Sequence, residues 1–314
     1  MEAADGRGRV DLRRRGDRLT EPRLLVTGAG GQLGRAVAEL RPDAILLTRR
    51  ALDVTEAGAA GEAMARHGPA IVLHAASWTK VDQAEADPDA VWAVNVGGTE
   101  AVARAAAAVG ALLVYPSTDY VFSGDAPRPY REDDATKPRT VYGRTKLEGE
   151  SAARSSPRHL IVRTSWVFGD GRNFVRAILD RARAGATIEV VGDQLGRPTY
   201  ALDLARGILS LAEGGYTKTF HLAGEGDPCS WADFAEATLD AAARAGLLKA
   251  RPRVERVTTD EWAAGRSAPV ADRPRYSVLD CARAESVGIR LRPWREALEE
   301  YVNGLAAGDG GDRA

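Results

Sequence analysis

The first half of the chain alternates short apolar runs with longer segments in which apolar residues recur every three or four positions. Such runs predict buried strands, and the periodic segments predict amphipathic helices. We expect strands at 23–27, 44–47, 70–74, 111–115 and 159–163, and helices at 32–40, 55–67, 89–109 and 141–153. Repeated strand–helix units predict a parallel sheet covered by helices on both faces, a Rossmann-type doubly wound α/β fold.

The pattern becomes less regular after about residue 165. We expect helices at 173–184, 201–212, 231–243 and 294–305, and short strands at 188–191, 219–222 and 253–257. This predicts a dinucleotide-binding domain over 23–165, followed over 166–305 by a smaller α+β substrate-binding region interleaved with the last strands and helices of the sheet. The ends, 1–22 and 306–314, predict disordered extensions, and the Pro-rich segment 126–140 predicts a loop.

Composition excludes several kinds of partner. The 314 residues are 44% apolar and 28% charged with a net charge of −1, so no excess charge points to nucleic acid or a membrane surface. No apolar stretch approaches the roughly 20 residues of a membrane span, and residues 1–22 lack the apolar core of a signal peptide. The two cysteines, Cys229 and Cys281, are far apart and fit a reducing compartment. We therefore expect a cytoplasmic protein without a structural metal.

A glycine-rich turn joins the first predicted strand to the first predicted helix. In LLVTGAGGQLGRAV the glycines follow G-x-x-G-x-x-G spacing, with Leu33 where G-x-G-x-x-G would place its last glycine. The first glycine permits a tight turn, the second lets the backbone approach a pyrophosphate, and the third lets the helix pack close to the strand. The helix N-terminus supplies unpaired N–H groups for phosphates. The predicted dinucleotide contacts are Gly28, Gly31, Gln32, Leu33 and Gly34.

The residues after the second predicted strand bear on the choice of dinucleotide. An acidic residue there would bind the ribose 2′-hydroxyl of NAD, whereas Arg49 and Arg50 suit the 2′-phosphate of NADP. The sequence therefore favours NADPH, with NADH as the alternative, although both arginines could be ordinary surface residues of an Arg-rich chain. Asp53 and Val54 follow, and we expect them near the adenine.

Tyr142 and Lys146 lie four positions apart in VYGRTKLEGE, so they share one face of the predicted helix. A phenol with a pKa of about 10 is a weak acid–base group, and a neighbouring ammonium lowers that pKa. We expect Tyr142 to protonate a carbonyl that receives hydride, and Lys146 to lower the pKa of the phenol and reach the nicotinamide ribose. The chain has five lysines against thirty-eight arginines, which argues against an incidental lysine here.

The glycine turn, the Ser117–Thr118 pair at the end of a middle strand, and the Tyr142/Lys146 pair together resemble the extended short-chain dehydrogenase/reductase superfamily. The blocks HAASWTKVDQAEADPDAVWAVN, STDYVFSG, YGRTKLEGE, VRTSWVFG, DQLGRPT and WREALEEYV, in this order over about 23–302, resemble the dTDP-4-dehydrorhamnose reductase family. The resemblance implies NADPH- or NADH-dependent reduction of the C4 ketone of dTDP-4-dehydro-6-deoxy-L-hexose, giving dTDP-L-rhamnose from dTDP-4-dehydrorhamnose.

The resemblance also implies roles for individual residues. Thr118 would be the active-site hydroxyl beside the catalytic pair, and Ala75 and Ala76 would line the cofactor site. Apart from the resemblance, Tyr120 has no Lys four residues on, so we expect Tyr120 and Phe122 to pack and shape the cleft. The implied substrate contacts are Thr118, Asp119, Trp166, Gln194, Arg197 and Pro198, with Thr199 on the same wall. Trp166 could instead be a core residue, Asp119 a cap of a turn or helix, and Arg197 a surface ion-pair partner.

Three other functions remain open. A related dTDP-4-keto-6-deoxysugar reductase of an antibiotic or glycoside pathway, including dTDP-dihydrostreptose-type synthesis, would share these motifs. A non-catalytic NADP-binding regulatory subunit would be expected to lack the Tyr or the Lys. An epimerase or dehydratase is disfavoured because no Glu follows Asp119. Some family members form dimers around a divalent cation, but no matching acidic residues stand out, so we expect a monomer or homodimer without a metal.

Overall fold

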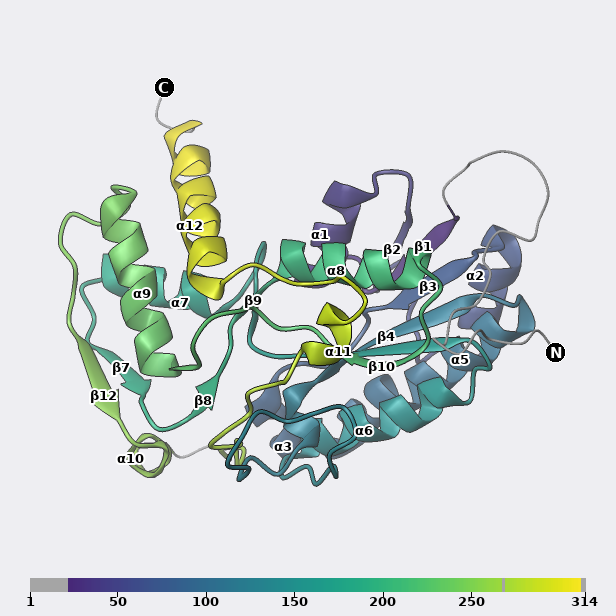
Figure 1. Cartoon of the computed structure of the whole chain (residues 1–314), viewed down its shortest axis with the longest axis horizontal. Helices are drawn as coiled ribbons and strands as arrows, with labels where there is room; N and C mark the ends of the chain where they lie inside the picture. Colours follow the sequence, from purple (N-terminus) through teal and green to yellow (C-terminus); the bar gives the residue numbers. More distant parts are fainter. Residues whose placement is uncertain (1–21, 267–268, 312–314) are drawn as a thin grey trace.

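The computed structural model describes residues 22–266 and 269–311. At its centre is a six-stranded sheet in the order β10-β5-β4-β3-β1-β2, with every neighbouring pair parallel (Figure 1). The strands are β1 (Leu24–Thr27), β2 (Ile45–Leu47), β3 (Ile71–His74), β4 (Leu112–Thr118), β5 (His159–Thr164) and β10 (Lys218–His221). The predicted Rossmann-type α/β fold is confirmed.

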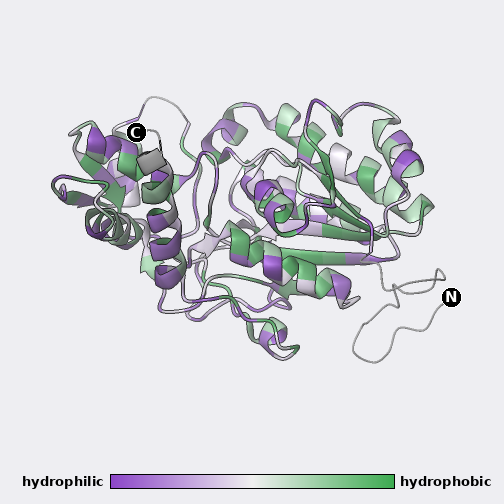
Figure 2. Ribbon diagram, turned by 90° about the horizontal axis from the view of Figure 1, so that it is seen from above, coloured by the Kyte–Doolittle hydropathy of each residue, from purple (hydrophilic) through white to green (hydrophobic). Residues whose placement is uncertain are grey.

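Helices cover both faces of this sheet, and the alternation of side chains along each strand explains why. Leu24 and Val26 of β1 point into one core cluster and Leu25 into the other. One face is covered by α1 (Gln32–Leu40) and α8 (Ala201–Glu213), which pack against each other. The other face is covered by α2 (Ala59–His67) and α5 (Gly98–Ala108), with α6 (Val141–Arg154) beside α5. Figure 2 shows the hydrophobic residues concentrated on the strands between these layers.

A second group of elements lies beyond one end of the sheet (Figure 1). Its helices are α7 (Phe174–Arg183), α9 (Trp231–Arg244) and α12 (Trp294–Gly311), which share a core that contains Phe234 and Trp294. Three two-stranded pairs complete it: β7 (Ile188–Val191) with β12 (Val254–Val257), β8 (Leu195–Gly196) with β11 (Cys229–Ser230), and β6 (Val167–Phe168) with β9 (Thr199–Tyr200). Short helices in other parts of the described chain are α3 (Val81–Ala86), α4 (Pro88–Trp92), α10 (Thr259–Ala264) and α11 (Ala282–Glu285), of which α3 and α4 contact α6.

Most predicted elements lie within about one residue of the observed bounds, and three inside the chain differ more. The helix expected at 55–67 begins at Ala59, because the Asp53 carboxylate accepts bonds from the Thr55 backbone and hydroxyl and holds a turn there. The helix expected at 89–109 contains a π-helical segment, η1 (Ala93–Gly97), between α4 and α5. The strand expected at 111–115 continues to Thr118, where it pairs with Thr164 of β5.

The chain ends also differ from expectation. The disordered tail expected from 306 is wrong for 306–311, because α12 continues to Gly311, and its Leu-Ala-Ala segment consists of good helix formers. Residues 1–21 and 312–314 lie outside the described residues. Among the residues that the structure describes, no helix combines the length and apolarity of a membrane span.

Candidate active site

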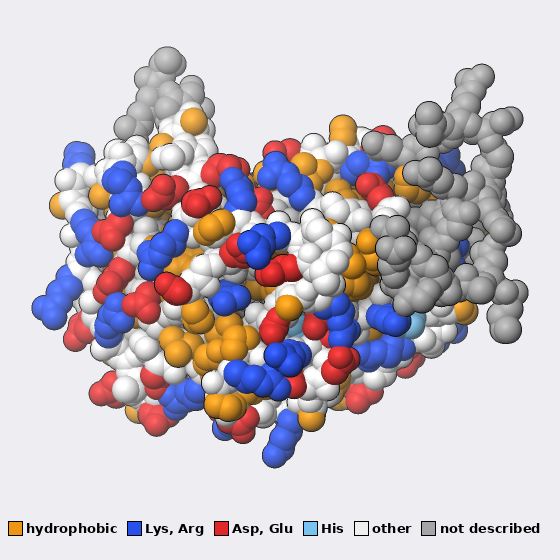
Figure 3. All heavy atoms as spheres, in the orientation of Figure 1, with side chains coloured by type: hydrophobic (Ala, Val, Ile, Leu, Met, Phe, Trp, Pro, Cys, Tyr) orange, Lys and Arg blue, Asp and Glu red, His pale blue; other side chains and the backbone are white. Residues whose placement is uncertain are grey.

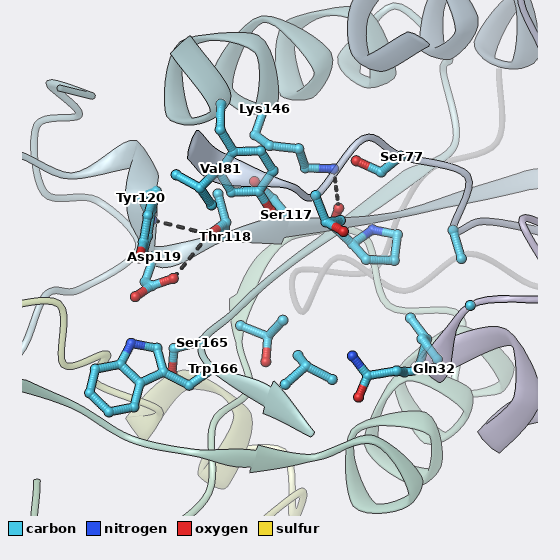
Figure 4. A pocket seen from close by; sticks show the side chains of 18 of the residues that line it. Gln32, Ser77, Val81, Ser117, Thr118, Asp119, Tyr120, Lys146, Ser165 and Trp166 are labelled. Carbon is cyan, nitrogen blue, oxygen red and sulfur yellow. Dashed lines mark hydrogen bonds between the residues drawn. The ribbon is translucent and has the colours of Figure 1, made fainter. Parts of the chain in front are cut away.

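A cavity of about 600 Å³ opens at the carboxyl ends of β1, β3, β4 and β5, where an open parallel sheet usually binds its ligands. It lies between the sheet layer and the group of helices around α9. Its lining includes many of the residues singled out from the sequence: Gly28, Gly31, Gln32, Leu33, Gly34, Ala75, Thr118, Asp119, Tyr120, Tyr142, Lys146 and Trp166. Figure 4 shows the polar residues of this set converging on one space.

The glycine turn forms one end of the cavity, and two of its glycines are required by the protein itself. Gly28 has φ +65°, and a Cβ there would lie 2.5 Å from the Ala76 nitrogen. A Cβ on Gly34 would lie 2.5 Å from the Ala29 Cα, so the helix could not pack this close to the turn. Ala76 therefore supports the turn from behind and, unlike Ala75, does not line the cavity.

Gly31 is different, because no protein atom lies closer than 3.4 Å to the position of its Cβ. It is the N-cap of α1, and no side chain caps the N–H groups that follow it. The open side of Gly31 and the uncapped N–H groups leave room for a phosphate to approach the backbone. The turn therefore fits the pyrophosphate of a dinucleotide.

The residues after β2 lie beside the turn but outside the cavity lining. The Ala29 N–H donates to the Leu47 carbonyl, which ties the end of β2 to the glycine turn. Arg50 is exposed, as is Arg49, whose side chain is 81% accessible and pairs with Asp53 at 3.2 Å. Asp53 also holds Thr55, and Val54 is buried, so neither points into the cavity.

Three side chains meet at the centre of the cavity. Thr118 is the last residue of β4, while α6 supplies Tyr142 and Lys146 from one face, one turn apart. The side chains of Thr118 and Tyr142 both line this cavity. The Lys146 ammonium donates to the Pro116 carbonyl at 2.8 Å and lies 4.0 Å from the centroid of the Tyr115 ring (Figure 4).

Burial shifts the pKa of both Tyr142 and Lys146. It raises the pKa of the Tyr142 phenol and lowers the pKa of Lys146 to about 7, because a site without water disfavours both charged forms. The expectation that Lys146 lowers the pKa of the phenol is therefore not met in this structure, where the ammonium is directed to Pro116. The phenol retains its proton at neutral pH and is available as a donor.

Asp119 follows Thr118 and is fully buried. Its Oδ1 accepts the Thr118 hydroxyl at 2.9 Å, and burial raises the pKa of the carboxyl to about 7. Figure 4 shows the side chain directed to the side of the cavity where Trp166 lies. It is thus a cavity residue rather than only the cap of a turn.

Trp166 forms the wall opposite Thr118 and has an unusual backbone. It adopts φ 47°, which is rare for a bulky residue, and its ring stacks on Trp231 at 3.7 Å between centroids. Gly196 lies against the ring, since a Cβ there would be 2.5 Å from Trp166. The strained backbone presents a flat aromatic face at the cavity, and such strain is typical of ligand sites.

The residues of the DQLGRPT block lie further away. Gln194 lines a second cavity of about 290 Å³ and donates to the Thr259 hydroxyl at 3.0 Å. Arg197 and Pro198 line neither cavity, and the carbonyl of Arg197 accepts the Ser165 hydroxyl at 2.7 Å. Thr199 is buried and donates its N–H to the Trp166 carbonyl. The block therefore supports the Trp166 wall more than it faces the first cavity.

Two cavity residues had no signal in the sequence. Arg273 and Trp231 line both cavities, and Arg273 is held by two bonds to Asp82 of 2.7 and 2.8 Å. One arginine among thirty-eight does not stand out, and Trp231 begins an ordinary amphipathic helix. Within the described residues, no cluster of His, Cys, Asp or Glu is placed to hold a metal ion.

Comparison with known proteins gives consistent relatives. The family model described as RmlD substrate binding domain matches residues 22–307. The chain is 42% identical to dTDP-4-dehydrorhamnose reductase of Streptomyces griseus, over 90% of this chain and 94% of that protein. It is 40% identical to a protein of Streptomyces antibioticus named probable dTDP-4,6-dihydroxy-2-methyloxan-3-one 4-ketoreductase, over 91% of this chain and 97% of that one. The solved structure of Bacillus anthracis dTDP-4-dehydrorhamnose reductase in complex with NADP shares 35% identity and a TM-score of 0.82, over 90% of this chain and 99% of that chain.

Proposed function

The chain belongs to the dTDP-4-dehydrorhamnose reductase family, and from this premise we propose that it reduces the C4 ketone of dTDP-4-dehydrorhamnose to give dTDP-L-rhamnose. One observation supports this proposal most directly. Thr118, Tyr142 and Lys146 line one cavity, beside a glycine turn that leads into a helix without a side-chain N-cap. The cavity thus combines a dinucleotide site with a proton donor, as a carbonyl reductase requires.

NADPH supplies the hydride when it is bound. We assign its pyrophosphate to the turn formed by Gly28, Gly31, Gln32, Leu33 and Gly34, and its nicotinamide half to the region of Ala75 and Lys146. Arg49 and Arg50, which are exposed beside the turn, suit the 2′-phosphate, and this favours NADPH over NADH. The NADP complex of the Bacillus anthracis relative supports the same cofactor.

The protein's own groups handle the proton. As hydride reaches C4, negative charge develops on the carbonyl oxygen, and donors placed there stabilise it. The Tyr142 phenol donates its proton to that oxygen, and because burial raises its pKa, the phenol stays protonated until then. Thr118 supplies a second hydrogen bond to the oxygen, and Lys146 faces the same space from α6.

We propose that the sugar lies between this group and the Trp166 face, with Asp119 beside it. Gln194, Arg197 and Pro198 would then belong to the wall toward the nucleotide. In this arrangement residues 23–165 form the dinucleotide-binding domain and 166–305 the substrate-binding region, which also contributes β10 and α8 to the sheet layer.

A second candidate is a related dTDP-4-keto-6-deoxysugar reductase with another substrate. The Streptomyces antibioticus relative, whose name describes a 4-ketoreductase of a different dTDP-sugar, favours it. The two candidates share the same catalytic groups, so the product has to separate them.

The test is NADPH oxidation with dTDP-4-dehydro-L-rhamnose, followed by identification of the product by NMR. We expect turnover and dTDP-L-rhamnose. Turnover of another dTDP-4-ketosugar together with inactivity on this one would replace the first candidate by the second. Inactivity on all of them would contradict both.

We further propose that the protein works in the cytoplasm, as a monomer or homodimer, without a nucleic-acid or membrane partner. Both cysteines are free, which suits a reducing compartment. On the face shown in Figure 3, basic and acidic side chains are intermixed and form no one-sign surface.

A further inference from the structure

The Thr118 hydroxyl has one proton, and two acceptors compete for it. In the structure its Oγ1 accepts the backbone N–H of Tyr120 at 3.2 Å, and its O–H donates to Asp119 Oδ1 at 2.9 Å. A hydroxyl that donates to Asp119 cannot also donate to the ketone oxygen of a substrate. The protonation of Asp119 therefore decides what Thr118 can do in the reaction.

The surroundings of Asp119 disfavour its charged form. The residue is 2% exposed, and its Oδ2 has no hydrogen-bond partner among the described residues. The hydroxyls of Ser277 and Thr118 lower the pKa of this carboxyl, but burial outweighs them. An ionised carboxylate without a paired cation is costly in such a place.

The titratable groups around Asp119 do not neutralise it. The phenols of Tyr142, from α6, and Tyr120 face it and are uncharged. Arg273, from the segment after residue 269, faces Tyr120, but its guanidinium is committed to Asp82. Lys146, also on α6, donates to the Pro116 carbonyl. Burial accordingly raises the pKa of Asp119 to about 7.

We propose that Asp119 acts as a protonated carboxylic acid that positions the proton of Thr118. The carboxyl O–H donates to Thr118 Oγ1, and the Thr118 O–H is then free to donate to the ketone oxygen beside Tyr142. Asp119 is thus a positioning residue that acts through Thr118. The inference rests on the proposed reductase reaction, which it refines by naming the group that controls the second hydrogen bond to the developing oxyanion.

The first test is the pH profile of kcat for Asp119→Asn, whose amide always donates. When Asp119 ionises, the wild type loses one donor at the oxyanion, which typically costs about 100-fold in kcat. We expect wild-type kcat to fall as pH rises through about 7 and this fall to be absent in Asp119→Asn. Because the pKa of Lys146 is also about 7, an unchanged fall in Asp119→Asn would assign it to Lys146 and overturn the proposal.

Glu132→Gln is the matched control. Burial also raises the pKa of Glu132, but this carboxylate accepts the His221 N–H and does not line the cavity. The glutamine retains an acceptor for His221, so the pH profile of kcat should stay as in the wild type. If kcat of Glu132→Gln also no longer decreased as the pH rises, the effect would not belong to Asp119, and the proposal would be overturned.

The second test needs no substrate. Infrared difference spectra between the wild type and Asp119→Asn should show the C=O stretch of a protonated carboxylic acid below pH 7, and this band should disappear above it. Absence of the band at low pH would overturn the proposal whether or not the enzyme turns over. Presence of the band in a protein inactive on every dTDP-4-ketosugar would instead contradict the proposed function and leave Asp119 protonated as inferred.

Discussion

At the scale of single residues, burial determines which groups of the site hold a proton at neutral pH. Burial raises the pKa of the Tyr142 phenol, which therefore keeps its proton at neutral pH. It also raises the pKa of the Asp119 carboxyl to about 7 and lowers the pKa of Lys146 to about 7. A neutral acid in a dry site can donate a hydrogen bond that a carboxylate could not. With Asp119 protonated, as we propose, Thr118 and Tyr142 can both donate to the carbonyl oxygen of a substrate.

Sequence spacing predicted part of this site, for a physical reason. Tyr142 and Lys146 share a helix face, and Thr118 ends a strand, so local structure alone places all three at the cavity. The state of Asp119 could not be predicted, because it follows from burial in the folded protein and from Ser277, which lies far away along the chain. The position of Arg273 at the cavity could not be predicted either, because its contact with Asp82 joins residues far apart in the sequence.

The raised pKa of Asp119 also predicts an effect on stability. The pKa of the Asp119 carboxyl is 3.8 in the unfolded chain and about 7 in the folded protein, so the folded protein binds this proton more tightly. The resulting stabilisation is fully present below pH 3.8 and is lost as the pH rises through 7. Between these values the wild type should lose about 4 kcal/mol of unfolding free energy relative to Asp119→Asn. Urea denaturation of both proteins at several pH values measures this, and parallel pH dependences would contradict it.

At the scale of elements, α6 is held to the sheet by a buried ion pair. Glu150 accepts two bonds from Arg163 of β5, at 2.8 and 2.9 Å, and one from the Ser117 hydroxyl at 2.6 Å. Both charged side chains are almost fully buried. Because Ser117 precedes Thr118, and Glu150 lies one turn after Lys146, this cluster fixes the strand end and the helix that carry the site.

We expect Glu150→Gln to be strongly destabilising. Removing one partner of a buried ion pair leaves an uncompensated charge, which costs about 3–5 kcal/mol. Arg154→Ala is the control, because Arg154 contacts the same carboxylate at 2.9 Å from a side chain that is 41% exposed, and such partners contribute about 1 kcal/mol or less. Thermal denaturation measures both, and equal losses of stability would show that the buried Glu150–Arg163 pair contributes no more than the exposed one.

The turn between β1 and α1 offers a second test at this scale. Gly34→Ala would bring a Cβ to 2.5 Å from the Ala29 backbone, so the helix must move away from the turn. We expect a loss of about 1–3 kcal/mol in unfolding free energy and weaker NADPH binding by fluorescence titration. Gly304→Ala in α12 should be neutral or stabilising, because a Cβ at Gly304 would have no packing neighbour within 4 Å. Normal NADPH affinity in Gly34→Ala would refute this view of the turn.

The sequence predicted elements with a clear pattern better than the two-residue strands. The helix at 32–40 and the strand at 188–191 match α1 and β7 in both bounds, because each has a clear periodic pattern or apolar run. The two-residue strands β6, β8, β9 and β11 were missed, since two residues carry no period. These short strands surround Trp166. The wall of the cavity that they form is therefore the part of the site that the sequence predicted least.

At the scale of the whole molecule, the site exists because late parts of the chain return to the sheet. β10 pairs with β5, and α8 packs on α1, so the second group of elements is attached beside the cavity rather than as a separate lobe. Trp166, Trp231 and Arg273 then face the glycine turn and the catalytic pair across one space. The alternating first half predicted the sheet, while this closure depends on contacts between residues far apart in the sequence.

We propose Tyr142 as the proton donor of a dTDP-4-ketosugar reduction. The most direct measurement is kcat of Tyr142→Phe with NADPH and dTDP-4-dehydro-L-rhamnose, together with NADPH affinity by fluorescence titration. We expect kcat to fall by about 100-fold or more, as for loss of a general acid, while NADPH affinity stays close to that of the wild type. Near-normal kcat in Tyr142→Phe would contradict it.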